Sequence, residues 1–160
     1  MVRPATPGDW GAIHAVETAA FGREDEALMV EASRAEGAAL LELVEEREGR
    51  VVGHILLNRM ITSPSRFIAG IAPVAVEPAF QGQGIGDALC RAGIAAMKAM
   101  GAGGVVLLGH PTYYPRFGFS HALAAPLGSP YADQEAFMAL ELTPGALSPP
   151  LRVDYPAAFG

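Results

Sequence analysis

A glycine-dense loop between two strand patterns constrains this chain more than any other feature. Residues 67–76 are rich in Ile, Val and Ala, as in a strand buried on both faces, and residues 104–108 form a second aliphatic run. Between them, Gln81-Gly82-Gln83-Gly84-Ile85-Gly86 leads into a helical pattern over residues 85–100. This order predicts a parallel β-α-β unit.

The flanking segments predict further elements around this unit. We expect two helices, the first capped by Asp9, a hairpin of two strands, the β-α-β unit, a short helical turn and two more extended segments. The ranges outside the β-α-β unit are 10–20, 24–35, 40–46, 51–60, 111–116, 117–119 and 136–142. The order predicts a mixed α/β or α+β fold.

Length and composition favour one domain. The chain has 160 residues, 51% of them hydrophobic, which suffices for one buried core, and no linker or repeat divides it. We therefore expect a single domain over residues 1–160. Residues 144–160 are Pro-rich and are expected to form an extension that wraps the surface.

Charge and cysteine content exclude several classes of partner. A formal net charge of −6 with dispersed Lys and Arg disfavours nucleic acid. No apolar stretch reaches the length of a membrane span. The only cysteine, Cys90, has no partner, and the four histidines lack metal-site spacing. We expect a cytoplasmic protein without a metal, and leave open whether it is a homodimer.

The glycine-dense loop has the character of an anion site. Backbone N–H groups at a helix N-terminus attract phosphate, although a tight turn can need glycines for its geometry alone. No lysine follows the glycines as a nucleoside-triphosphate loop requires, and the residue three past Gly84 is Asp87 instead of the glycine of a dinucleotide fingerprint.

The segment from Val74 to Gly86 instead resembles the acetyl-CoA signature of the GNAT superfamily of N-acetyltransferases. Gln81, Gly84 and Gly86 stand at its three defining positions. Further along, Tyr114 precedes a Gly-Phe pair by four residues, which is similar to a later element of that family.

The resemblance implies a mixed, centrally splayed sheet flanked by helices, and acetyl-CoA as cosubstrate. Pro73 would lie where the central strand bulges away from its parallel neighbour. The acceptor would be a primary amine of a small molecule, peptide or protein; the alternative is a noncatalytic acyl-CoA-binding or regulatory module on the same fold. The implied cofactor-binding residues are Val74, Ala75, Val76, Gln81, Gly82, Gln83, Gly84, Ile85 and Gly86.

Tyr114 is the candidate catalytic acid, because a phenol stays protonated at neutral pH and can donate to the leaving thiolate. Tyr113 is expected either to line the acceptor site or to pack, and Asp87 to point outward from the phosphates. Cys90 is expected to be a core residue. The general base is left open among Glu17, Glu24, His54, Glu77, His110 and water.

Overall fold

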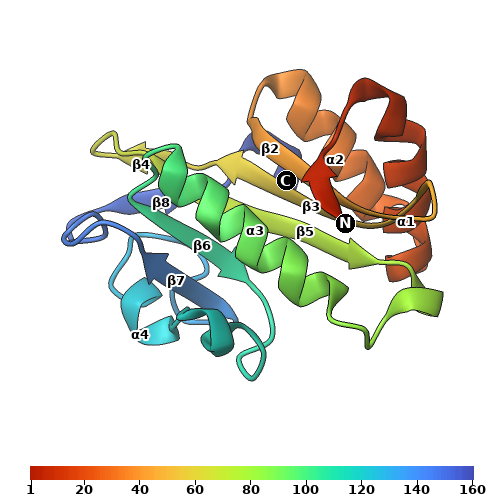
Figure 1. Cartoon of the computed structure of the whole chain (residues 1–160). Coiled ribbons are helices and arrows are strands. Elements are labelled where there is room, and N and C mark those ends of the chain that lie inside the picture. The colour runs from red at the N-terminus through yellow and green to blue at the C-terminus, as the bar shows by residue number, and fades with distance from the viewer.

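The protein is a mixed sheet with helices on both faces (Figure 1). The computed structural model describes residues 1–160, the whole chain. The main sheet has six strands in the order β1-β2-β3-β5-β6-β7, and β4 and β8 form a separate pair. The strands are β1 (Val2–Pro4), β2 (Ala39–Arg47), β3 (Arg50–Arg59), β4 (Ile61–Ser63), β5 (Ile68–Val76), β6 (Gly104–Leu108), β7 (Phe137–Glu141) and β8 (Arg152–Asp154).

The helices agree with most of the sequence patterns. They are α1 (Trp10–Phe21), α2 (Asp25–Glu36), α3 (Ile85–Ala99) and α4 (His121–Ala124), joined by short 3₁₀ turns. Within the main sheet only β5 and β6 run parallel, with α3 as their crossover. The predicted β-α-β unit is therefore confirmed.

Two layers of helices cover the sheet because β3 is apolar toward both faces. Ile55 and Leu57 pack with Leu89 and Met97 of α3, whereas Leu56 packs on the opposite face with the α1 and α2 side chains. Figure 1 shows α3 crossing one face, with α1 and α2 on the other. Alternation along a strand sends successive side chains to opposite faces, so both layers are anchored on the same strand.

The hairpin of β2 and β3 turns through two residues. Arg47 pairs with Arg50, and Glu48 and Gly49 between them have φ values of 52° and 74°. Positive φ at both positions matches the type I′ turn, whose twist suits adjoining antiparallel strands. The predicted hairpin is confirmed.

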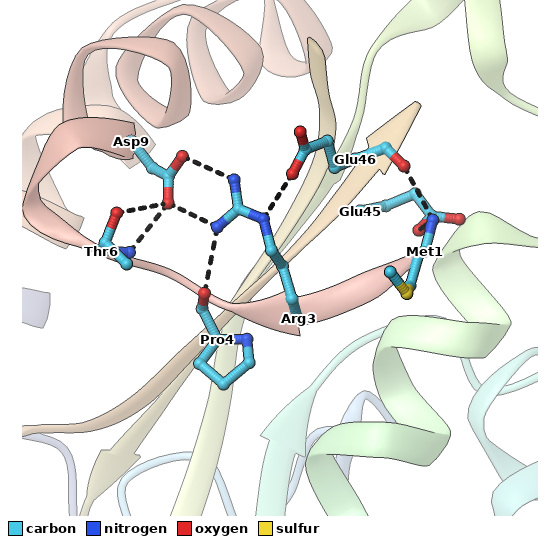
Figure 2. A network of polar contacts seen from close by, with 7 residues as sticks. All are labelled: Met1, Arg3, Pro4, Thr6, Asp9, Glu45 and Glu46. Carbon is cyan, nitrogen blue, oxygen red and sulfur yellow. Dashed lines mark hydrogen bonds and ion pairs between the residues drawn. The ribbon is translucent and has the colours of Figure 1, made fainter. Parts of the chain in front are cut away.

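A charged network holds β1 and the start of α1 to the edge of the sheet (Figure 2). The Arg3 guanidinium donates to both oxygens of Asp9, at 2.8 and 2.9 Å, and through Nε to Glu46 at 2.5 Å. Asp9 also accepts from the Thr6 backbone N–H at 2.8 Å. Although Asp9 stands at the N-cap position of α1, its side chain makes no cap hydrogen bond there. The expectation that the Asp9 side chain caps α1 is therefore wrong, because its carboxylate accepts hydrogen bonds from Arg3 and Thr6 instead.

The segment after Tyr114 differs from the expected extended stretch. A 3₁₀ turn covers Tyr114–Phe117, Gly118 follows with φ 98°, and α4 begins at His121. The Ser120 hydroxyl caps α4 by accepting from the Leu123 N–H at 3.2 Å. Serine is a preferred N-cap residue, and of the expected extended stretch only an isolated antiparallel bridge between Ser120 and Ala139 forms.

Residues 144–160 do more than wrap the surface. Leu147, Leu151 and Val153 are buried, and they join a core cluster with Ile68 and Phe137. β8 pairs with β4 in antiparallel fashion. These apolar residues share the cluster with Ala124 of α4, so the segment contributes to the core in addition to wrapping the surface. None of the helices has the length and apolar character required to cross a membrane.

Candidate active site

The two central strands separate after a short paired segment. β5 and β6 pair only from Ile68 to Gly70, opposite residues 104–106, although β5 continues to Val76. On its other side β5 has a register irregularity against β3, between the pairs Ile55–Val74 and Leu57–Ile71. Pro73 lies inside this bulge, where its missing N–H removes no regular ladder bond. The structure thus confirms the splayed sheet and the bulge at Pro73.

The glycine-dense loop presents a set of free backbone donors. Gly82 and Gly84 have φ values of 80° and 82°, and α3 begins directly after Gly84. The N–H groups of residues 82–87 donate to no backbone or side-chain acceptor of the protein. The Gln81 side-chain amide donates to the Val76 carbonyl at 3.0 Å and so ties the loop to the end of β5. Free N–H groups at a positive helix end form an anion site.

Most of the predicted cofactor residues surround one cavity at this loop. The cavity has a volume of about 410 Å³. Six of the nine predicted residues line it: Val76, Gln81, Gly82, Gly84, Ile85 and Gly86. Val74 lines the neighbouring cavity instead. Gln83 accepts a hydrogen bond from Arg47 at 3.0 Å, and the Ala75 side chain packs on the α1 face, so neither side chain faces a cavity at the loop.

Tyr113 and Asp87 belong to the rim of the loop cavity. The Tyr113 hydroxyl donates to Asp87, and the Arg116 guanidinium lies 4.2 Å from the Tyr113 ring centroid and 3.7 Å from Asp87 Oδ2. Burial and the Asp87 carboxylate raise the pKa of Tyr113. Asp87 therefore turns toward the cavity, contrary to expectation, and Tyr113 does not reach the acceptor side. Arg116 offsets the negative charge that Asp87 brings near an anion site.

Tyr114 lies in the second cavity, between the diverging strands. This cavity of about 800 Å³ is bounded by residues 71–74 of β5 and by residues 108–111, which begin at the last residue of β6. The Tyr114 ring packs edge-on against Phe119 at 6.1 Å, and its hydroxyl has no hydrogen-bond partner in the protein. Burial raises the pKa of Tyr114 to about 12, so the phenol stays protonated at neutral pH.

Comparison with known proteins agrees with this geometry. Residues 10–119 match the profile of the acetyltransferase (GNAT) family, which is more than half of the chain. The chain belongs to the GNAT family. The resemblance inferred from Gln81, Gly84, Gly86 and Tyr114 is therefore confirmed at the level of the family, and so is the fold class.

Three GNAT proteins illustrate the similarity. The uncharacterized N-acetyltransferase YjhQ of Escherichia coli (strain K12) is 44% identical over 114 residues, which are 67% of this chain and 62% of that protein, less than two thirds of its length. A GNAT family acetyltransferase from Brucella melitensis, crystallised with acetyl-CoA, is 37% identical with a TM-score of 0.84 over 100% of this chain and 97% of its own. The E. coli GNAT protein YhbS, crystallised with CoA, is 30% identical with a TM-score of 0.90 over 99% and 91%.

Two of the candidate bases lie in a closed network of the GNAT fold. His54 is fully buried, with Nδ1 2.5 Å from Glu17 and Nε2 2.8 Å from Glu42, which also accepts twice from Arg34. Burial alone would lower the pKa of His54, but the hydrogen bonds to both carboxylates raise it. Burial raises the pKa of Glu17. Neither group lines the loop cavity or the second cavity, so we assign this network to holding α1 and α2 on the sheet.

The remaining candidate bases separate by position. Glu24 is exposed and pairs with His14 at 3.1 Å, and Glu77 pairs with Arg50 away from the second cavity. Of the side chains considered, only His110 lines that cavity. Glu26 also lines it and was missed by the sequence analysis. Glu24 stands just before α2 and Glu26 in its first turn, and a rotation of about 100° per residue turns the two carboxylates to different sides.

Gly109 leaves the space that the Tyr114 ring occupies. A Cβ atom at position 109 would lie 2.2 Å from Cε2 and 2.6 Å from Cδ2 of Tyr114. Gly109→Ala is therefore expected to push the ring of this candidate catalytic residue aside and to lower kcat about 10²-fold, the effect that a misplacement of about 1 Å can have. Steady-state assays would measure this, with a thermal melt to check folding. An unchanged kcat would show that the ring position is not needed.

Proposed function

We propose that this chain transfers the acetyl group of acetyl-CoA to a primary amine. The observation that carries the proposal is that two cavities follow one another along β5. The first contains the free N–H groups of residues 82–87, and the second contains Tyr114 between the splayed strands. The Brucella relative crystallised with acetyl-CoA, and YhbS crystallised with CoA, support it.

Each part of the cosubstrate would contact a different part of this arrangement. The pyrophosphate would bind the N–H groups of the loop, because successive donors and the α3 N-terminus favour negative charge. The pantetheine arm would follow β5 from Val76 to Val74 along the edge that β6 leaves free beyond Gly70. This path would bring the thioester to the cavity that contains Tyr114.

The chemical step is a nucleophilic acyl substitution in which the acetyl group passes directly from the thioester to the amine. The neutral amine nitrogen attacks the thioester carbonyl carbon, a C–N bond forms, and the C–S bond breaks with its electron pair on sulfur. The proton lost by the nitrogen ends on the thiolate, so atoms and charge balance. Tyr114 donates a hydrogen bond to the sulfur while negative charge develops there.

The raised pKa of Tyr114 sets a limit on its role. A phenol with a pKa of about 12 gives up its proton less readily than a thiol of ordinary pKa, roughly 8.5. If Tyr114 protonates the thiolate, it must regain a proton from the amine nitrogen within the same turnover. The proton of the amine nitrogen would pass through His110 or a water molecule beside it. Glu26 is not available as the acceptor of this proton, since both of its carboxylate oxygens are bound by Arg23.

Ligand binding and turnover test the proposal separately. Acetyl-CoA and CoA are expected to raise the melting temperature, because ligands that bind only the folded state stabilise it, whereas ATP and NAD should have little effect. Thiol release with an amine panel then measures transfer. Cys90 is buried and gives little background in that assay. A larger shift with ATP or NAD would contradict the cosubstrate, and CoA binding without turnover would favour a noncatalytic module.

A further inference from the structure

The second cavity extends well beyond the place of the thioester. Its far side is formed by Phe21 at the end of α1, Met29 of α2, and Tyr155 and Phe159 near the C-terminal end of the chain. These four side chains are here called the apolar wall. Ten of the sixteen residues lining the cavity are hydrophobic. At about 800 Å³, its volume lies within the range of small-molecule sites.

The apolar wall is held in place by contacts between its own rings and with residues outside the cavity. The Phe159 and Tyr155 rings lie 4.8 Å apart, and Tyr155 packs edge-on against Tyr131 at 5.7 Å. The Ala158 N–H donates to Glu36 of α2 at 2.8 Å. The C-terminal segment is thereby fixed to the helix that contributes Met29, so both parts of the apolar wall form one surface.

The cavity carries no surplus negative charge despite the acidic chain. Its only carboxylate is Glu26, whose two oxygens accept from Arg23 at 3.0 and 2.6 Å. The hydrogen bonds from Arg23 lower the pKa of Glu26, so the pair stays ionised and neutral as a whole. A polycationic amine would find no second carboxylate in the lining.

These observations together narrow the class of acceptor. We infer that the acceptor is a small primary amine attached to an apolar, aromatic or branched alkyl body that packs against the apolar wall. Polyamines lack a matching charge there, and the polar backbone of a peptide would lose water against the apolar wall, whose only polar side-chain group is the Tyr155 hydroxyl. The inference rests on the proposed acetyl transfer for its assay, but binding tests it independently.

An acceptor comparison is the first test. With saturating acetyl-CoA, phenethylamine is expected to show a kcat/KM at least about 10-fold above spermidine and above an alanine-initiated tripeptide, the order of discrimination that an apolar pocket gives. A preference for spermidine or the peptide would overturn the acceptor class while leaving acetyl transfer intact. If no amine is acetylated, calorimetry of phenethylamine with the CoA-saturated protein decides: binding supports the apolar site, and no binding overturns it.

Substitutions in the apolar wall are the second test. Phe159→Ala is expected to raise the KM for phenethylamine about 10-fold and to leave the KM for acetyl-CoA unchanged. Phe21→Ala should act in the same direction, and its side chain is exposed enough for folding to tolerate the change. Ala157→Ser, on the same 3₁₀ turn with an exposed side chain outside the cavity, is the matched control. An unchanged KM in both wall variants, or an equal rise for spermidine, would contradict the inference.

Discussion

Tyr114→Phe is expected to lower kcat for acetyl transfer by about 10²–10⁴-fold, the usual contribution of a positioned proton donor. The ring packs against Phe119 and Tyr113, and phenylalanine keeps these contacts. Only the hydroxyl is lost, and it makes no hydrogen bond within the protein. Steady-state kinetics should therefore show kcat and kcat/KM falling together, because the interaction is made in the transition state.

A matched control removes a hydroxyl elsewhere. Tyr131 does not line the second cavity, and Tyr131→Phe keeps the ring that packs against Tyr155. Its kcat should equal that of the unaltered protein. If Tyr114→Phe keeps a normal kcat on a verified acceptor, Tyr114 is not the donor to sulfur, and a water molecule would have to protonate the thiolate.

Gly86→Asp is expected to weaken CoA binding about 10²-fold or more. A Cβ at position 86 would lie 3.5 Å from the Tyr113 hydroxyl and 3.9 Å from Val76 Cγ2, so the backbone accepts a side chain without a clash. The added carboxylate would then stand in the loop cavity beside Asp87. Two like charges about 4 Å apart repel by roughly 1–4 kcal/mol near a protein surface, and the pyrophosphate carries more than one charge.

Calorimetry with CoA measures this effect. Gly11→Asp is the control, because it adds the same charge on α1, where a Cβ would meet nothing within 4 Å. Its CoA affinity should stay unchanged. A folded Gly86→Asp variant that binds CoA normally would remove the basis for placing the pyrophosphate at residues 82–87.

Features that depend on residues close together in the chain could be predicted from the sequence. The β-α-β unit, the hairpin turn at Glu48-Gly49 and the loop from Gln81 to Gly86 are of this kind. Glycine permits the backbone conformations of these turns, and the spacing of apolar residues follows the period of a helix or strand. The order of residues alone is therefore enough to indicate these elements and, with them, the family.

The set of side chains that line the second cavity depends instead on tertiary packing. His54 is a reasonable base by residue type, but it is buried between Glu17 and Glu42, and Glu26 enters the cavity where its neighbour Glu24 does not. The apolar wall joins Phe21 with Phe159, residues from opposite ends of the chain. Such contacts depend on how helices pack across the sheet, because a rotation or shift of one helix exchanges the side chains that face a cavity, and no local pattern encodes that packing.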